Sequence, residues 1–263
     1  MNRRHCLLLL SAGLLPASAA RLLPASAAAE VAGGLVARVL DGDTFMLGGG
    51  DEVRLAGVLA PKPWQLPAQA GPAAAALPAR ATAALDAMAH GRSVTLAFDA
   101  RPRDRNDRLL AQVERDDGLW LEGELLRRGL VRVCTSPDNR ARADAMLALE
   151  AAARARRQGL WAVPEFRVLD AEAAARFVGS FQIVEGSVRD LGQGREQTYL
   201  HFGASRRASL TLSIALAERR RFQAAGRSPR TLVGRRLRVR GWIQALGGPV
   251  IEATHPEQIE VLD

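Results

Sequence analysis

The order of apolar and polar positions divides the chain into two regions rich in short strands. From Gly34 onward, apolar residues alternate with polar ones over short stretches, which are separated by turns rich in glycine or aspartate. This pattern predicts antiparallel strands joined by tight turns. Five strands are expected in the first region, at 35–40, 44–47, 52–58, 93–98 and 108–115.

Three helices are expected among these strands. The first begins near Pro78, because proline is tolerated in a first helical turn. The second is short and amphipathic (119–130), and the third is a long helix that Asp138 or Asn139 caps and that runs to Gln158. Three strands, a helix, two strands and two helices are compatible with a five-stranded barrel of the oligonucleotide-binding (OB) type.

A second alternating region follows and predicts a smaller β domain. Six strands are expected there, with one helical stretch near 217–225, and this order is again OB-like, although simple barrels and sandwiches of similar size share the pattern. We therefore expect a mainly β protein with helices. Residues 30–165 should form the five-stranded OB-type barrel, 166–178 a linker, and 179–263 the second, smaller OB-like β domain.

Residues 1–29 have the features of a secretory signal peptide. A basic start with Arg3 and Arg4 precedes a short apolar run and then small-residue cleavage sites. The apolar run is shorter than the roughly 20 residues that a membrane-spanning helix needs, so no stable membrane anchor is expected. This segment implies a periplasmic or extracellular protein. Because Cys6 would leave with it, Cys134 would be the one remaining cysteine, and we expect it as a small core residue.

The positive charge is concentrated in the second region. The chain carries a net charge of +8; residues 30–178 hold equal numbers of basic and acidic side chains, whereas 179–263 hold thirteen arginines and eight acids. A basic domain could bind phosphate groups. The alternative is a compositional preference for arginine, since Lys62 is the only lysine of the chain.

One predicted strand carries a stripe of cationic and aromatic side chains. Arg236, Arg238, Arg240 and Trp242 alternate with other residues and so share one face of the strand. Guanidinium groups beside an aromatic ring suit a nucleic-acid backbone with stacked bases. The alternative, which we favour, is that the stripe has no binding role and is the solvent-exposed face of an antiparallel strand.

Three motifs in the first region point to a known family. They are VARVLDGDTFML with the following VRLAGVLAP, then DRNDRLLAQV with the following DGLW, and finally QGLW. In this order and spacing they span nearly all of residues 34–161, and together they resemble the staphylococcal nuclease (thermonuclease) family. The resemblance implies an OB-type barrel and an exported hydrolase that cuts phosphodiesters in DNA and RNA with one calcium ion.

The resemblance also implies roles for particular residues. Asp43 matches the family's first metal-binding carboxylate, and a backbone carbonyl ligand would fall at Ala60. Arg54 and Arg108 match the two catalytic arginines, which bind the phosphate and stabilise the negative charge that grows on it.

Two positions depart from the family's pattern. Leu59 stands where the family has a metal-binding aspartate, and Lys62 stands where it has a glutamate that acts as general base. Calcium is therefore the expected cofactor only if the family mechanism is retained, and otherwise none is expected. Lys62 could reach Asp43 and form a phosphate-binding pocket with the two arginines, or it could point to solvent from its proline-rich loop.

Two functions follow from these observations. The first is a thermonuclease-family enzyme that hydrolyses nucleic acid. The alternative is a non-catalytic protein on a nuclease-like scaffold, which binds nucleic acid, another anion or a protein partner. Nucleic acid, either DNA or RNA, is the partner that the resemblance implies.

Overall fold

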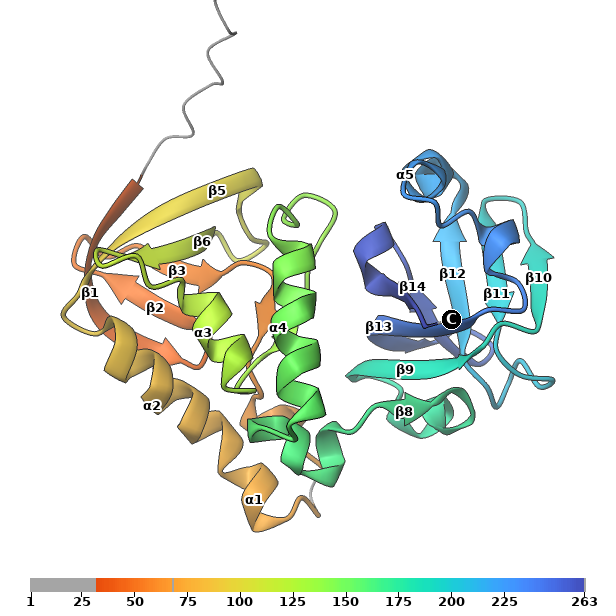
Figure 1. Ribbon diagram of the computed structural model, residues 1–263, viewed down its shortest axis with the longest axis horizontal. Helices are drawn as coiled ribbons and strands as arrows, with labels where there is room; N and C mark the ends of the chain where they lie inside the picture. The colour runs from red at the N-terminus through yellow and green to blue at the C-terminus, as the bar shows by residue number, and fades with distance from the viewer. Residues whose placement is uncertain (1–31, 68, 263) are drawn as a thin grey trace, which may run out of the picture.

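The computed structural model describes residues 32–67 and 69–262. The signal peptide expected at 1–29 lies outside the described residues. The described chain forms two β domains, called here the N-terminal barrel and the C-terminal domain, and helix α4 (Ala143–Ala155) lies between them (Figure 1). No helix in this part of the chain combines the length and the apolar character that a membrane crossing requires.

Five strands close the N-terminal barrel in the order β1-β2-β3-β6-β5. Neighbouring strands are antiparallel except β3 and β6, which run parallel. This closed barrel confirms the five-stranded OB-type fold expected from the sequence. The strand bounds are β1 (Ala32–Asp41), β2 (Thr44–Leu47), β3 (Glu52–Leu55), β5 (Ser93–Arg103) and β6 (Leu109–Arg115).

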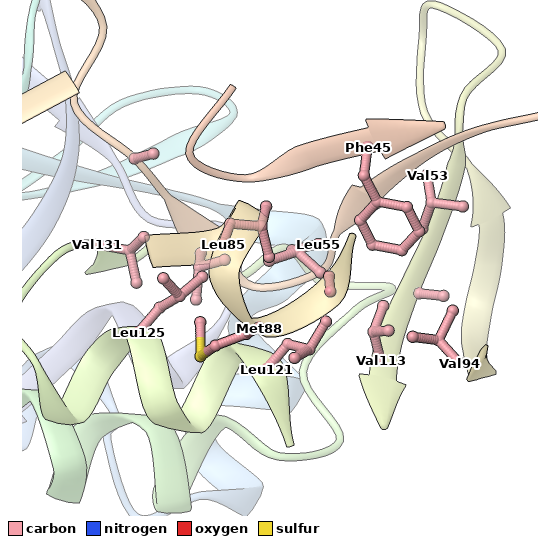
Figure 2. Packing of buried hydrophobic residues seen from close by; sticks show 14 of the residues in the cluster. Phe45, Val53, Leu55, Leu85, Met88, Val94, Val113, Leu121, Leu125 and Val131 are labelled. Atoms are coloured by element: carbon pink, nitrogen blue, oxygen red, sulfur yellow. The ribbon is translucent and has the colours of Figure 1, made fainter. Parts of the chain in front are cut away.

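The core of the barrel forms where the inward faces of the strands meet two helices. Phe45, Leu55 and Val113 come from the strands, and they pack with Leu85 of α2 (Leu77–Ala89) and Leu121 of α3 (Leu121–Arg127) (Figure 2). Since alternate strand residues point to opposite faces, the apolar positions of the sequence pattern are the ones that become buried. A short helix, α1 (Pro72–Ala75), precedes α2.

The third helix starts later than the sequence suggested. We expected Asp138 or Asn139 to cap it and the helix to run to Gln158, but α4 extends from Ala143 to Ala155. The amides of Arg140 and Ala141 instead donate to the carboxylate of Asp99, at 2.8 and 3.0 Å. These hydrogen bonds hold the residues before α4 in a loop, which tertiary contacts favour over the local helical pattern.

A two-stranded ribbon beside the barrel carries Leu59 and Arg132. Strand β4 (Val58–Leu59) pairs antiparallel with β7 (Arg132–Val133), which places Leu59 opposite Arg132. Strands this short cannot be recognised from alternation, because two residues carry no period.

The C-terminal domain is a β domain built on an eight-stranded sheet. The strand order is β10-β11-β12-β14-β13-β9-β8, and β15 pairs with β13 off this path. All six strands expected from the sequence are present, and the helical stretch is α5 (Arg219–Ala224). The bounds are β8 (Leu169–Asp170), β9 (Phe181–Ser187), β10 (Asp190–Gln193), β11 (Gln197–His201), β12 (Thr211–Ala215), β13 (Arg236–Ala245), β14 (Pro249–Glu252) and β15 (Ile259–Val261).

The segment 166–178, expected as a linker, is packed against the C-terminal domain. Strand β8 within it pairs in parallel with β9, and the 3₁₀ helix η4 (Ala171–Phe177) follows directly. Ala171 and Ala174 belong to the buried core of this domain. Small apolar side chains allow this close packing, which an alanine-rich composition alone did not reveal.

The two domains are joined by polar contacts between α4, the loop before it and the C-terminal domain. Three contacts between side chains, at 2.6–2.8 Å, cross the interface: Arg140 Nη1 to Glu257 Oε1, Thr135 Oγ1 to His255 Nε2, and Arg240 Nη1 to Glu150 Oε2. His255 is fully buried there, and burial lowers the pKa of its imidazole to about 4. The imidazole is therefore neutral at pH 7.

Candidate functional site

Asp43 lies at the turn between β1 and β2, in the DGDT motif, and its side chain is fully buried. The turn packs closely on its surroundings: a Cβ atom at Gly42 would lie 2.6 Å from the Cβ of Ala81 and 2.8 Å from that of Ala60. Only glycine fits at that contact. The close packing fixes the turn and aims the Asp43 carboxylate inward.

Two cations and one amide bind the Asp43 carboxylate. Arg54 Nη1 and Lys62 Nζ contact Oδ1 at 2.5 and 2.7 Å, and the amide of Ala60 donates to Oδ2 at 2.6 Å. Burial raises the pKa of Asp43, whereas the charges of Arg54 and Lys62 act in the opposite direction. Contacts this short to two cations hold the group as a carboxylate.

Lys62 also pairs with a second aspartate. Its Nζ lies 2.6 Å from Oδ2 of Asp41, and the lysine itself is buried. Partial burial would raise the pKa of Asp41, but hydrogen bonds with Asp43 and Lys62 outweigh it and lower that pKa to about 2. Of the two interpretations of Lys62, the side chain pointing to solvent is therefore excluded, and the contact with Asp43 is present.

The two arginines implied by the resemblance have different partners. Arg54 donates from Nη2 to the carbonyl of Val58 at 3.1 Å, besides its contact with Asp43. Arg108 instead pairs with Asp104, whose Oδ2 lies 2.6 Å from Nη2 and 2.8 Å from Nε. Partial burial opposes the effect, but the Arg108 hydrogen bonds lower the pKa of Asp104. Arg54 and Lys62 thus meet at Asp43, while Arg108 stays on the neighbouring hairpin.

The donor set around Asp43 does not fit calcium. Calcium takes six to eight oxygen ligands, mainly carboxylates and carbonyls. Leu59, at the position of the family's second metal-binding aspartate, offers none, and the Lys62 ammonium directly contacts the Asp43 oxygen that a metal would need. Among residues 32–67 and 69–262 no group of three or more His, Cys, Asp or Glu could hold a metal ion.

These residues open onto a cleft of about 660 Å³ that both domains line. Two tryptophans stand on its walls: Trp64 of the 3₁₀ helix η1 (Pro63–Gln65) is 74% exposed, and Trp242 of β13 is 41% exposed. The ring of Phe181 meets that of Trp242 edge to face, with centroids 6.1 Å apart, and so restrains it. The cleft thus has an aromatic ring from each domain.

The cleft has an excess of positive charge. Two acids, Asp41 and Asp104, line it and Asp43 lies beneath, against five cationic side chains, which are Arg54, Lys62, Arg101, Arg105 and Arg108. Arg105 is exposed, and no carboxylate among the described residues pairs with it. An anion entering this cleft meets a net positive field.

The arginine stripe of β13 is solvent-exposed only in part: Arg236 and Trp242 are exposed, as expected, whereas Arg238 is half-buried and Arg240 is buried. Arg240 is 1% exposed and binds carboxylates on both sides, Glu150 of α4 and Glu260 of β15. Arg238 lies between Glu185 and Glu260. The carboxylates that bury these arginines lie on strands and a helix distant in sequence, so a single strand could not reveal them. Within the stripe, Trp242 is the residue that reaches the cleft.

Two members of the site escaped the sequence analysis. Neither Asp41 nor Trp64 was singled out as a site residue. The two-residue spacing of the acids in DGDT was the available signal for Asp41, since both flank the same turn. Cys134, expected in the core, is half-buried and lines the cleft, and burial raises the pKa of its thiol.

A comparison with known protein families finds a match that covers most of the N-terminal barrel. Residues 52–163 match the family model described as staphylococcal nuclease homologue. That range covers β3 to α4 and the QGLW turn, which include Arg54, Lys62 and Arg108. No curated protein matched the sequence. From β3 onward, the N-terminal barrel of this chain is therefore similar to the staphylococcal nuclease family, and a C-terminal β domain follows the matched residues.

Proposed function

We propose that this protein binds single-stranded nucleic acid, or nucleotides, in the cleft between its two domains, and that it does so without calcium-dependent hydrolysis. The observation that carries the proposal is the contact of the Lys62 ammonium with both Asp41 and Asp43. A cation of the protein itself sits on the carboxylate that the family resemblance assigns to the metal.

The charges of the cleft favour an anionic ligand. Arg54 and Lys62 neutralise Asp43 and Asp41, and Arg105 adds a positive charge without a carboxylate partner among the described residues. Phosphate groups would bind by charge-assisted hydrogen bonds to these side chains. Binding would weaken with added salt, because neutralised phosphates release their counterions.

The two exposed tryptophans favour single strands over duplexes. A base can stack on Trp64 or Trp242 only if it is unpaired and free to turn toward the ring. Aromatic rings beside a cationic groove are the usual means of binding single strands without sequence preference. The ligand would touch both domains, since one ring comes from each.

Hydrolysis is the weaker proposal because no carboxylate of the described cleft is available as a base. Asp41 and Asp43 hold Lys62, and Asp104 holds Arg108. A carboxylate bound to a cation is a poor proton acceptor, and loss of a general base reduces rates by roughly 100- to 10,000-fold.

Fluorescence titration of the purified protein with short oligo(dT) and oligo(rU), in calcium and in chelator, tests the proposal. We expect binding that salt weakens and chelator does not, without release of nucleotides. Trp64→Ala and Trp242→Ala should each weaken binding by roughly 5- to 150-fold, which corresponds to about 1–3 kcal/mol of lost stacking. Leu246→Ala, an exposed side chain outside the cleft, serves as the control.

Each contrary result identifies another function. Calcium-dependent release of nucleotides by the unaltered protein would favour the thermonuclease-family enzyme instead. Failure to bind either oligonucleotide at low salt would remove nucleic acid as the ligand and leave a different anion or a protein partner.

A further inference from the structure

Arg132, on β7 at the junction of the two domains, is a buried cation that lacks a carboxylate partner. Its exposed fraction is 5%, and its guanidinium lies between two aromatic rings, 5.1 Å from the centroid of Phe166 and 5.0 Å from that of Phe181. Nη1 donates to the carbonyl of Phe181 at 2.8 Å. Nε is buried without a hydrogen-bond partner.

A second arginine of the same interface shows how such a charge is normally compensated. Arg240 is also fully buried and also has an unpartnered Nε, but Glu150 and Glu260 contact its two terminal nitrogens. Among the described residues no carboxylate lies within ion-pair distance of Arg132. Burial lowers the pKa of Arg132 to about 10, which leaves it charged at pH 7. The Glu150 charge acts on Arg132 from beyond ion-pair distance, but that carboxylate is already paired with Arg240. A buried charge without a direct counterion is costly, so Arg132 is poised to accept an anion.

Arg132 lines a second cavity of about 530 Å³, which adjoins the cleft described above at Gln65. Its walls include apolar side chains, among them Leu66, Phe177 and Val178. Of these, Val178 is 44% exposed and so lies at the open edge of the cavity.

The other charges of this cavity also favour an anion. Arg167 and Arg176 line it and are exposed. The one acid of the lining, Glu165, accepts a hydrogen bond from the Gly71 amide at 2.9 Å. The cavity therefore presents three cations and one acid, together with an apolar wall.

We propose that this junction cavity is a second binding site, which takes a small organic anion whose carboxylate or phosphate group pairs with Arg132 and whose apolar or aromatic body rests on Phe177 and Val178. The guanidinium can donate two parallel hydrogen bonds to either oxyanion. The two flanking rings hold the guanidinium in place, so little conformational freedom is lost on binding.

Calorimetric titration of the full chain with four probes tests the proposal. Benzoate and phenyl phosphate carry both an oxyanion and a ring, inorganic phosphate lacks the ring, and benzyl alcohol lacks the charge. We expect at least one of the first two to bind at least ten-fold more tightly than either partial probe. Tighter binding of benzoate would indicate a carboxylate ligand, and tighter binding of phenyl phosphate would indicate a phosphate ligand.

Two kinds of variant locate the binding. Arg132→Met should weaken it by at least ten-fold. Because that buried change could prevent folding, Val178→Asp places a negative charge at the exposed edge of the cavity and should weaken binding by a similar factor. Val233→Asp, at a valine of nearly equal exposure outside the cavity, is the matched control.

The proposal is wrong if benzyl alcohol or inorganic phosphate binds as tightly as the complete probes, or if Val178→Asp and Val233→Asp behave alike. Trp64→Ala lies in the nucleic-acid cleft and should leave this binding unchanged. Loss of probe binding in Trp64→Ala would place the anion in the cleft instead. The test therefore succeeds or fails independently of the proposed nucleic-acid binding.

Discussion

Glu122 of α3 is a fully buried carboxyl group inside the N-terminal barrel, with the Val113 amide 3.1 and 3.2 Å from its two oxygens. Burial raises its pKa from the ordinary 4.5 to about 8. The folded protein then keeps a proton that the unfolded chain releases above pH 4.5. The free energy of unfolding should therefore fall as the pH rises from about 4.5 to 8, by at most about 5 kcal/mol from this group.

Glu122→Gln should remove that part of the pH dependence, because the amide keeps an acceptor for Val113 and does not ionise. Urea denaturation of both proteins at several pH values measures the difference, in which the contributions of other groups cancel. Glu124→Gln, on the same helix but partly exposed and paired with two arginines, is the control. An equal pH slope in the unaltered protein and in Glu122→Gln would show that Glu122 is ionised in the folded state.

The residues around Asp43 allow the disabled-site interpretation to be tested directly. The double variant Leu59→Asp and Lys62→Glu removes the ammonium group from Asp43. It also places carboxylates at the two positions that depart from the family's pattern. We expect calcium-dependent cleavage of DNA or RNA to appear, by about 100-fold or more over the parent. Lys62→Met alone, which removes the cation without adding a ligand, should not gain cleavage. Equal activity of the double variant and the parent would mean that the site is not limited at these positions.

Contacts between residues could be predicted from the sequence only where both residues belong to a motif of the resembled family. The resemblance of the DGDT turn and the following strand to the family's motif indicated that Arg54 and Asp43 belong to one site, and it left Lys62 with two alternatives. The structure selects one because the loop after β4 brings Lys62 to two carboxylates at once. Arg132 could not be recognised, since its surroundings come from residues 166 and 181.

At the scale of elements, the QGLW motif shows why a sequence signature can be a packing constraint. Gly159, with φ of +59°, lies against the backbone of the chain that follows α3: a Cβ atom there would lie 2.1 Å from the carbonyl oxygen of Gly129 and 2.6 Å from that of Arg128. The amide of Leu160 donates to the same Gly129 oxygen at 2.8 Å. The ends of α3 and α4 thus meet through bare backbone.

Gly159→Ala should therefore destabilise the protein by more than the cost of the left-handed conformation alone, because the added Cβ would also collide with the backbone of Gly129 and Arg128. Gly91 is the matched control, because its φ is +69° and nothing lies within 4 Å of an added Cβ. We expect a loss of about 1–2 kcal/mol for Gly91→Ala, from the left-handed conformation, and more than about 3 kcal/mol for Gly159→Ala. Urea denaturation measures both. Equal losses would mean that the backbone contact adjusts without strain.

Strands long enough to show alternation were predictable from the sequence. Short strands that exist only through pairing with distant segments were not. The five barrel strands carry alternation along their length, so they were found from the sequence. Strands β4, β7 and β8 have two residues each and exist only through their pairing. The start of α4 was misplaced for the same reason, because Asp99, far away in sequence, binds the residues that were expected to begin it.

The whole molecule is held together by an interface that composition could not reveal. Arg240 on β13 reaches across to Glu150 of α4, which also accepts from the Val133 amide at 2.7 Å. The strand expected to face solvent is therefore partly an interdomain strand. Two separate β regions were evident from the sequence, but their mutual contact depends on side chains from opposite ends of the chain.

If this contact couples the domains, the protein should unfold in a single calorimetric transition. Arg240→Met leaves Glu150 and Glu260 without their shared cation, and breaking a buried pair typically costs about 3–5 kcal/mol. We expect the transition of Arg240→Met to split in two and proteases to cut before β8, near 164–168. Arg238→Met is the matched control, since both of its carboxylate partners, Glu185 and Glu260, lie within the C-terminal domain. It should lower the melting temperature without separating the domains, because it leaves the bridge to α4 intact. Two transitions in the unaltered protein, or equal splitting in both variants, would show that Arg240 does not couple the domains.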